Sequence, residues 1–159
     1  YKDKARNLVM ALKHGDRTDL AAPAASWIER AAAPLLRDNP LVCPVPLHWS
    51  RLLKRRYNQS ALLAAHLSRQ VRLDHWPDML KRVKVTPSLE GKTRAQRFSA
   101  LSQAIVAHPR HQTLMQGRVV LLVDDVMTSG ATLTACADAC RAAGAADVRV
   151  AVLARVTRA

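Results

Sequence analysis

One short segment constrains the fold of this chain more than any other. Five consecutive apolar residues, Val119 to Val123, form a run that is typical of a strand buried on both faces, as in a parallel sheet. Two carboxylates, Asp124 and Asp125, follow the run, and a small polar turn leads through Gly130. We therefore expect the strand to end at the acidic pair and a new element to begin after the turn.

A helix and a second strand are predicted downstream of the turn. From Ala131 onward, apolar residues recur at the spacing of one buried helical face, at Leu133, Cys136, Ala137 and Cys140. Gly144 is placed to end that helix in the left-handed conformation, and residues 148–153 are predicted to form the next strand. The segment is thus a βαβ unit, with its turn at the carboxyl end of a strand, where open α/β sheets bind their ligands.

The turn contains the parts of a phosphate site. Amides at a helix N-terminus point outward unpaired, and the helix dipole adds partial positive charge there. Gly130 permits a backbone conformation that a side chain would hinder, and three hydroxyls can cap the helix or donate to phosphate, those of Thr128, Ser129 and Thr132. Because the acidic pair would repel a bare phosphate, we expect it to face ribose hydroxyls or a magnesium ion.

Residues 120–132 resemble the phosphoribosyl-pyrophosphate (PRPP) motif of type I phosphoribosyltransferases. In that family the two acids hold the ribose 2′- and 3′-hydroxyls. The resemblance implies a catalytic role for Asp124 and Asp125, with Mg²⁺ held near them through the ligand. It also implies that the 5′-phosphate lies in a loop formed by Val126, Met127, Thr128, Ser129, Gly130, Ala131 and Thr132. A Walker loop and a dinucleotide fingerprint do not fit, because the Gly-Lys-Ser/Thr of the first and the three glycines of the second are absent.

A second segment, residues 43–65, is similar to the signature of ComF-type competence proteins, with its Pro-Val-Pro-Leu start and its Tyr-Asn-Gln followed by Leu-Leu-Ala. In this segment Arg56 replaces the family's usual Gly before Tyr57. A third block of that family is partly kept: Arg82, Thr86 and Arg97 match, whereas Leu89 and Ala100 stand where the family usually has Gln and Asn. The resemblance implies a type I phosphoribosyltransferase-like α/β fold, with a mostly parallel sheet flanked by helices. It covers residues 1–159 as one domain, without the Cys-rich segment that ComF-type proteins often carry before it.

The pyrophosphate end of PRPP requires a backbone turn and cations near the end of another strand. Our candidates are Pro46, Leu47, His48, Arg51 and Arg55. The alternative is that this segment is a solvated basic loop.

The charge balance favours polyanionic partners, since 25 basic residues face 12 acidic ones and the net charge is +13. The candidates for nucleic-acid contact are Lys54, Arg55, Arg56 and Tyr57. An aromatic side chain beside cations can stack on single-stranded DNA, although Tyr57 can equally anchor its loop to the core. A generic basic surface, rich in arginine, is the alternative to a DNA-binding patch.

Other patterns complete the expected fold. Strands are predicted over residues 41–46 and 79–85, and helices over residues 19–33, capped by Asp19, and 58–69. A capping box over residues 93–96 opens a further helix, in which the inward-facing residues are Ala95, Phe98, Leu101 and Ile105.

No apolar run is long enough to span a membrane, and the charged start is unlike a signal peptide. The three cysteines fit small core residues of a reduced, cytoplasmic protein.

Two functions of different class follow. The first is a PRPP-dependent phosphoribosyltransferase that transfers a pentosyl group to an unidentified acceptor. The second is a non-catalytic, single-stranded DNA-binding accessory protein of natural transformation, acting with the competence machinery in DNA uptake. The fold alone does not decide between them, and neither the acceptor nor the oligomeric state follows from the sequence.

Overall fold

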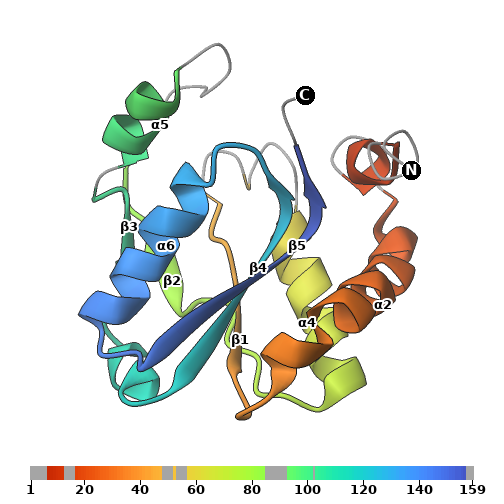
Figure 1. The fold of residues 1–159 in the computed structure, drawn as a ribbon, viewed down its shortest axis with the longest axis horizontal. Helices are drawn as coiled ribbons and strands as arrows, with labels where there is room; N and C mark the ends of the chain where they lie inside the picture. Colours follow the sequence, from red (N-terminus) through yellow and green to blue (C-terminus); the bar gives the residue numbers. More distant parts are fainter. Residues whose placement is uncertain are drawn as a thin grey trace.

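The computed structural model describes residues 7–12, 17–47, 52, 57–84, 93–101 and 103–156. A three-stranded sheet, with both pairs parallel, has the order β1 (Leu41–Pro44), β4 (Val119–Met127), β5 (Asp147–Arg155). Figure 1 shows α6 (Ala131–Ala142) on one face of this sheet, and α2 (Ala21–Ala32) and α4 (Gln59–Val71) on the other. The predicted α/β class and the βαβ unit are confirmed.

β4 is the central strand and is buried on both faces. Val120 and Leu122 belong to the hydrophobic cluster that includes the inner face of α6. Leu121 and Val123 belong to a second cluster, which is formed with α2 and α4. Successive side chains of a strand point to opposite faces, so the uninterrupted apolar run supplies both halves of the core. This part of the sequence prediction is confirmed.

The predicted buried face of α6 is also confirmed. Its four expected residues, Leu133, Cys136, Ala137 and Cys140, are all buried. Gly144 follows the helix with φ +90°, in the left-handed region that favours glycine. Cys43, Cys136 and Cys140 are free and buried, and burial raises the pKa of the Cys140 thiol to about 12. The cysteines are therefore protonated core residues.

The start of α2 differs from the prediction. A 3-10 turn over Thr18–Leu20 precedes the helix, and the helix itself begins at Ala21. Asp19 does not cap α2, because both of its carboxylate oxygens accept bonds from the Arg17 guanidinium at 2.8 Å. Pro23 lies in the first turn of α2, where its missing N–H has no helical partner to lose.

A second, two-stranded antiparallel sheet lies beside α6 and pairs β2 (Leu80–Arg82) with β3 (Ile105–Ala107). The predicted capping box that opens α5 (Arg94–Leu101) is present, since Thr93 and Gln96 exchange hydrogen bonds of 2.9 and 3.2 Å.

The predicted extent of this helix was wrong. α5 ends at Leu101, because Gln103 adopts φ +55° and turns the backbone out of the helix. Ile105 consequently belongs to β3, and Ala95 is exposed. The strand predicted over residues 79–85 is likewise shorter, at Leu80–Arg82.

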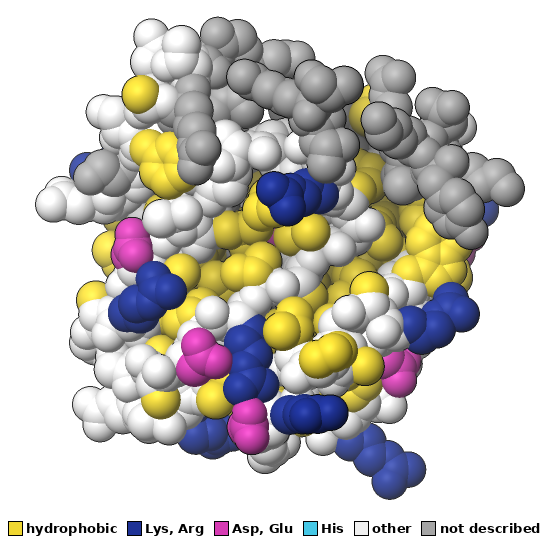
Figure 2. Space-filling view, in the orientation of Figure 1, with side chains coloured by type: hydrophobic (Ala, Val, Ile, Leu, Met, Phe, Trp, Pro, Cys, Tyr) yellow, Lys and Arg dark blue, Asp and Glu magenta, His cyan; other side chains and the backbone are white. Residues whose placement is uncertain are grey.

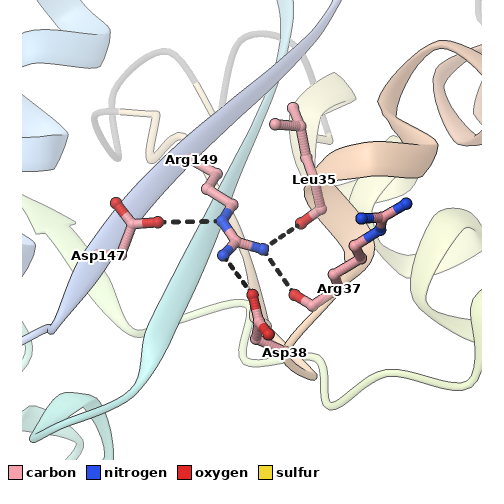
Figure 3. Close-up of polar contacts among 5 residues, drawn as sticks. All are labelled: Leu35, Arg37, Asp38, Asp147 and Arg149. Atoms are coloured by element: carbon pink, nitrogen blue, oxygen red, sulfur yellow. Dashed lines mark hydrogen bonds and ion pairs between the residues drawn. The ribbon is translucent and has the colours of Figure 1, made fainter.

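Arg149 of β5 ties the sheet to the segment that leads from α2 into β1 (Figure 3). Its guanidinium donates to Asp38 at 2.6 Å and Asp147 at 3.0 Å, and to the carbonyl oxygens of Leu35 at 3.0 Å and Arg37 at 2.6 Å. Asp38 and Asn39 have φ of +67° and +50°, a left-handed conformation that Asp and Asn adopt more readily than other residues with a side chain. Arg149 therefore holds this turn against the sheet. In the described part of the chain, no helix is both long and apolar enough to cross a membrane.

Candidate functional site

The acidic pair lies within β4, not after it. β4 continues to Met127 because its pairing with β5 continues, through Val126 opposite Ala154 and Met127 opposite Arg155. The expectation that the strand stops at Asp124 was therefore wrong. Asp124 is half-buried, whereas Asp125 is buried with 7% of its surface exposed. The two carboxylates thus occupy different environments.

The predicted phosphate loop and one of the two acids surround a single small hollow of about 40 Å³. Its lining consists of Asp124, Val126, Met127, Thr128, Ser129, Gly130, Ala131, Thr132 and Leu133. Every loop residue named from the sequence is present in this lining. Asp124 joins them, but Asp125 does not. The structure therefore brings one carboxylate, a polar turn and the amino end of α6 together around one hollow.

Gly130 is the N-cap residue of α6 and has φ +80° and ψ −5°. This left-handed conformation is the one that the sequence predicted for a glycine at this position. The Ala131 N–H donates to Ser129 Oγ at 3.4 Å, and the Thr134 N–H donates to the Gly130 carbonyl at 2.9 Å. The turn thus places the amino end of α6 at the hollow, where unpaired helix amides favour an anion.

Three polar residues to which the sequence analysis assigned no role lie at the start of α4, and one of them, Ser60, contacts Asp124. Asn58 caps the helix: its Oδ1 accepts the Ser60 N–H at 3.0 Å, and its Nδ2 donates to the Val45 carbonyl at 3.0 Å. The Ser60 hydroxyl donates to Asp124 Oδ1 at 2.7 Å. Gln59 is buried, and its Nε2 has no hydrogen-bond partner among the described residues. The Asn-Gln pair of the ComF-type signature is the sequence signal that could have identified Asn58 and Gln59.

The segment that follows β1 lies beside the carboxyl end of β4. The Val45 N–H donates to the Val123 carbonyl at 3.0 Å, directly before Asp124. Pro46, which is buried, and Leu47, which is half-buried, continue from this point. These two of the proposed pyrophosphate residues therefore begin next to the acidic pair. The other three, His48, Arg51 and Arg55, lie outside the described residues.

Of the candidates for nucleic-acid contact, only Tyr57 is described; Lys54, Arg55 and Arg56 lie outside the described residues. The Tyr57 ring is half-buried, and its hydroxyl donates to the Leu12 carbonyl at 2.7 Å. This contact favours the interpretation that Tyr57 anchors its loop. On the face drawn in Figure 2, Lys and Arg side chains are spread among hydrophobic surface and a few acidic groups.

Two other features are separate from this site. A wider groove of about 610 Å³ runs between α6 and the α5–β3 segment, and its lining includes Phe98, Leu101, Val106 and Ala135. It contains no residue of the acidic pair, so its size alone does not make it the site of phosphate chemistry. Within the described ranges, no group of three His, Cys, Asp or Glu side chains could hold a metal ion by itself.

Comparison with known proteins agrees with this geometry. The family model described as "Phosphoribosyl transferase domain" matches residues 57–158, more than half of the chain. Competence protein F of Haemophilus influenzae is 34% identical over 142 residues, covering 81% of this chain and 62% of that protein. The DNA utilization protein YhgH of Escherichia coli K12 is 29% identical over 160 residues, covering 98% of this chain and 69% of its own length. The chain thus spans about two thirds of the length of these relatives.

Solved structures support the fold. The glutamine PRPP amidotransferase of B. subtilis superposes with a TM-score of 0.59 at 17% identity, over 91% of this chain and 30% of that one. The protein TT1426 of Thermus thermophilus superposes with a TM-score of 0.52 at 15% identity, over 87% and 85% of the two chains.

A parallel sheet with an acidic pair and a small-residue turn at the carboxyl end of its central strand is the architecture of the phosphoribosyl transferase domain family, to which this chain belongs. Within that family it is a ComF-type, phosphoribosyltransferase-like protein, as its similarity to competence protein F and YhgH indicates.

Proposed function

We propose that the protein binds PRPP or ribose 5-phosphate together with Mg²⁺ at the carboxyl end of β4. One observation carries the proposal: Asp124 and all seven residues of the predicted loop line one hollow at the amino end of α6. Helix amides and a left-handed glycine suit the 5′-phosphate, and a carboxylate beside them suits a hydroxyl donor.

The residues present also fit a magnesium ion. Mg²⁺ prefers oxygen ligands and commonly binds through one or two carboxylates plus substrate phosphates. Asp124 would supply a carboxylate at the hollow, and the ligand's own oxygens would complete the coordination. When bound, the ion would neutralise the charge of the pyrophosphate leaving group. The chain's own part is to orient the ribose and fix its phosphate, which is the positioning that phosphoribosyl transfer requires.

Isothermal titration calorimetry with PRPP, with and without Mg²⁺, tests the proposal. We expect saturable binding that weakens when Mg²⁺ is omitted. Asp124→Asn should lower the affinity by about 1–3 kcal/mol, the range for a lost hydrogen bond to a charged group. Asp138→Asn is a matched control, because Asp138 is an exposed carboxylate of α6 that pairs with Arg141 at 3.3 Å. A wild-type protein that gives no heat with PRPP, or Asp124→Asn and Asp138→Asn variants of equal affinity, would contradict the proposal.

Transfer itself requires an acceptor. With PRPP and Mg²⁺ bound, we expect release of pyrophosphate when the right base or amine is supplied, and this release should be lost in Asp124→Asn. Screening nucleobases and amines by a coupled pyrophosphate assay would identify the acceptor class. Tight PRPP binding without pyrophosphate release from any acceptor would favour a sensor or accessory role for the same site.

Single-stranded DNA binding is a second candidate function, favoured by the net charge of +13. Fluorescence anisotropy at several salt concentrations measures it, and each phosphate contact should contribute about 0.7 to the slope of log affinity against log salt. Arg55→Glu with Arg56→Glu should reduce both affinity and slope. If Tyr57 stacks on a base, Tyr57→Phe should keep the affinity and Tyr57→Ala should reduce it by about 1–3 kcal/mol. Equal binding by the double Glu variant and the wild type would exclude this loop as the DNA surface.

A further inference from the structure

Ser60 makes a contact that its position in α4 does not require. It is the second residue of the helix and is 5% exposed, and its hydroxyl donates to Asp124 Oδ1, 64 positions away in the sequence, at 2.7 Å. Ser68 is equally buried in the same helix, but its hydroxyl donates to the carbonyl of Ala65 at 3.0 Å. A bond back to the preceding turn is the usual behaviour of a helical serine. Ser60 instead connects α4 to the functional end of β4.

Two donors converge on the same carboxylate oxygen. Asp124 Oδ1 accepts the Ser60 hydroxyl and also the backbone N–H of Asp125, at 2.9 Å. Rotation of the carboxylate would break both bonds, so together they fix the plane of the group. The carboxylate also lies at the amino end of α4, where the helix dipole favours a negative charge. Asp124 is therefore held in one orientation.

The contact is part of a closed ring of hydrogen bonds through three elements. Ser60 N–H is held by Asn58, Asn58 holds the Val45 carbonyl, and the Val45 N–H donates to the carbonyl of Val123, the residue before Asp124. The ring fixes the amino end of α4 relative to the ends of β1 and β4. The backbone of Ser60 consequently cannot move to follow Asp124 if the carboxylate turns away.

We propose that Ser60 is a positioning residue, which orients the Asp124 carboxylate toward the ribose hydroxyl of the phosphoribosyl ligand. This rests on the proposed function, in which Asp124 accepts from that hydroxyl. Ser60 itself acts through Asp124, and Asn58 holds Ser60 in place.

A double-mutant cycle in calorimetry with ribose 5-phosphate and Mg²⁺ tests the proposal. Ser60→Ala should weaken binding about tenfold, the loss of one hydrogen bond to a charged group, and Ser60→Thr, which keeps the hydroxyl, should restore most of the affinity. In the Asp124→Ala background, Ser60→Ala should change the affinity less than about twofold, because the acceptor through which it acts is gone. Ser68→Ala should match the wild type. An equal loss in both backgrounds, or wild-type affinity in Ser60→Ala, would overturn the positioning role.

A ligand-free measurement separates this inference from the proposed function. In crystal structures of the ligand-free protein, the Asp124 carboxylate should keep its orientation in the wild type and in Ser60→Thr and should turn in Ser60→Ala, because the hydroxyl that holds Oδ1 is then missing. The backbone N–H of Asp125 is common to all three proteins, so the difference reports on Ser60. If the wild type binds no ribose 5-phosphate while the carboxylate turns as expected, the proposed function fails and the orienting contact stands. A carboxylate in the wild-type orientation in Ser60→Ala overturns the inference.

Discussion

Two glycines at opposite ends of β4 allow backbone strain to be separated from ligand contact. Gly117 precedes the strand with φ +67°, and Gly130 follows it with φ +80°. A Cβ added at Gly117 meets no atom within 4 Å, and one added at Gly130 meets only the Met127 sulfur at 3.9 Å, an ordinary contact. An alanine at either position is therefore strained by its conformation and not by crowding.

The expected magnitude follows from that conformation. A left-handed backbone costs a residue with a Cβ about 1–2 kcal/mol, and the lower entropy of the unfolded alanine variant offsets about 0.4–1 kcal/mol. We expect Gly117→Ala and Gly130→Ala each to lose about 1 kcal/mol of unfolding free energy, which lowers Tm by about 2–4 °C in a domain of this size.

Ligand binding should distinguish the two variants. Gly130 lines the hollow and Gly117 does not, so only Gly130→Ala should weaken binding of PRPP. Differential scanning calorimetry gives the stability and titration calorimetry gives the affinity. Wild-type affinity in Gly130→Ala would refute the assignment of this loop to the phosphate. A Tm that is unchanged in both variants would refute the strain argument.

Three further outcomes are expected. Arg149→Met should lower Tm clearly more than Arg141→Met. Arg149 donates to two carboxylates and two carbonyls, whereas Arg141 pairs with one exposed carboxylate. Equal Tm values would show that the Arg149 contacts do not stabilise the turn. The cysteines should not react with Ellman's reagent at about pH 8 in the native protein, because burial raises their pKa values. All three should react after unfolding. Rapid reaction in the native state would contradict this expectation. Asp124→Asn should weaken PRPP binding more than Asp125→Asn, because Asp124 alone of the pair lines the hollow. A larger loss of affinity in Asp125→Asn, measured by calorimetry, would place the ribose on the other side of β4.

The elements that the sequence predicted correctly are those in which the local spacing of apolar residues indicates the buried faces. β4 carries an unbroken apolar run because both of its faces are covered, and α6 carries its buried residues at helical spacing because one face is covered. Gly144 and Gly130 were predictable for the same local reason, since each occupies a backbone conformation that disfavours a side chain.

Boundaries were less predictable, because a neighbouring strand or a single left-handed residue decides them. Asp124 and Asp125 are poor strand formers, yet they remain in β4 because β5 continues to pair beyond them. The helix that starts at Thr93 has a favourable pattern through Ile105, yet it ends at Leu101, where Gln103 turns and β3 finds its partner in β2. In both cases tertiary pairing outweighs local preference.

The polar ring around Asp124 could not be predicted from periodicity for a further reason. Asn58 and Ser60 are ordinary residues for the first turn of a helix, where caps and hydroxyls are common. Their second role depends on β1 and α4 meeting the end of β4, so it follows from contacts between segments far apart in the chain. The sequence motif supplies the groups that we propose contact the ligand, and the packing of α4 against the sheet supplies the neighbour that we propose orients one of them. A motif transplanted without the amino end of α4 would therefore keep the loop and its amides but lose the fixed carboxylate.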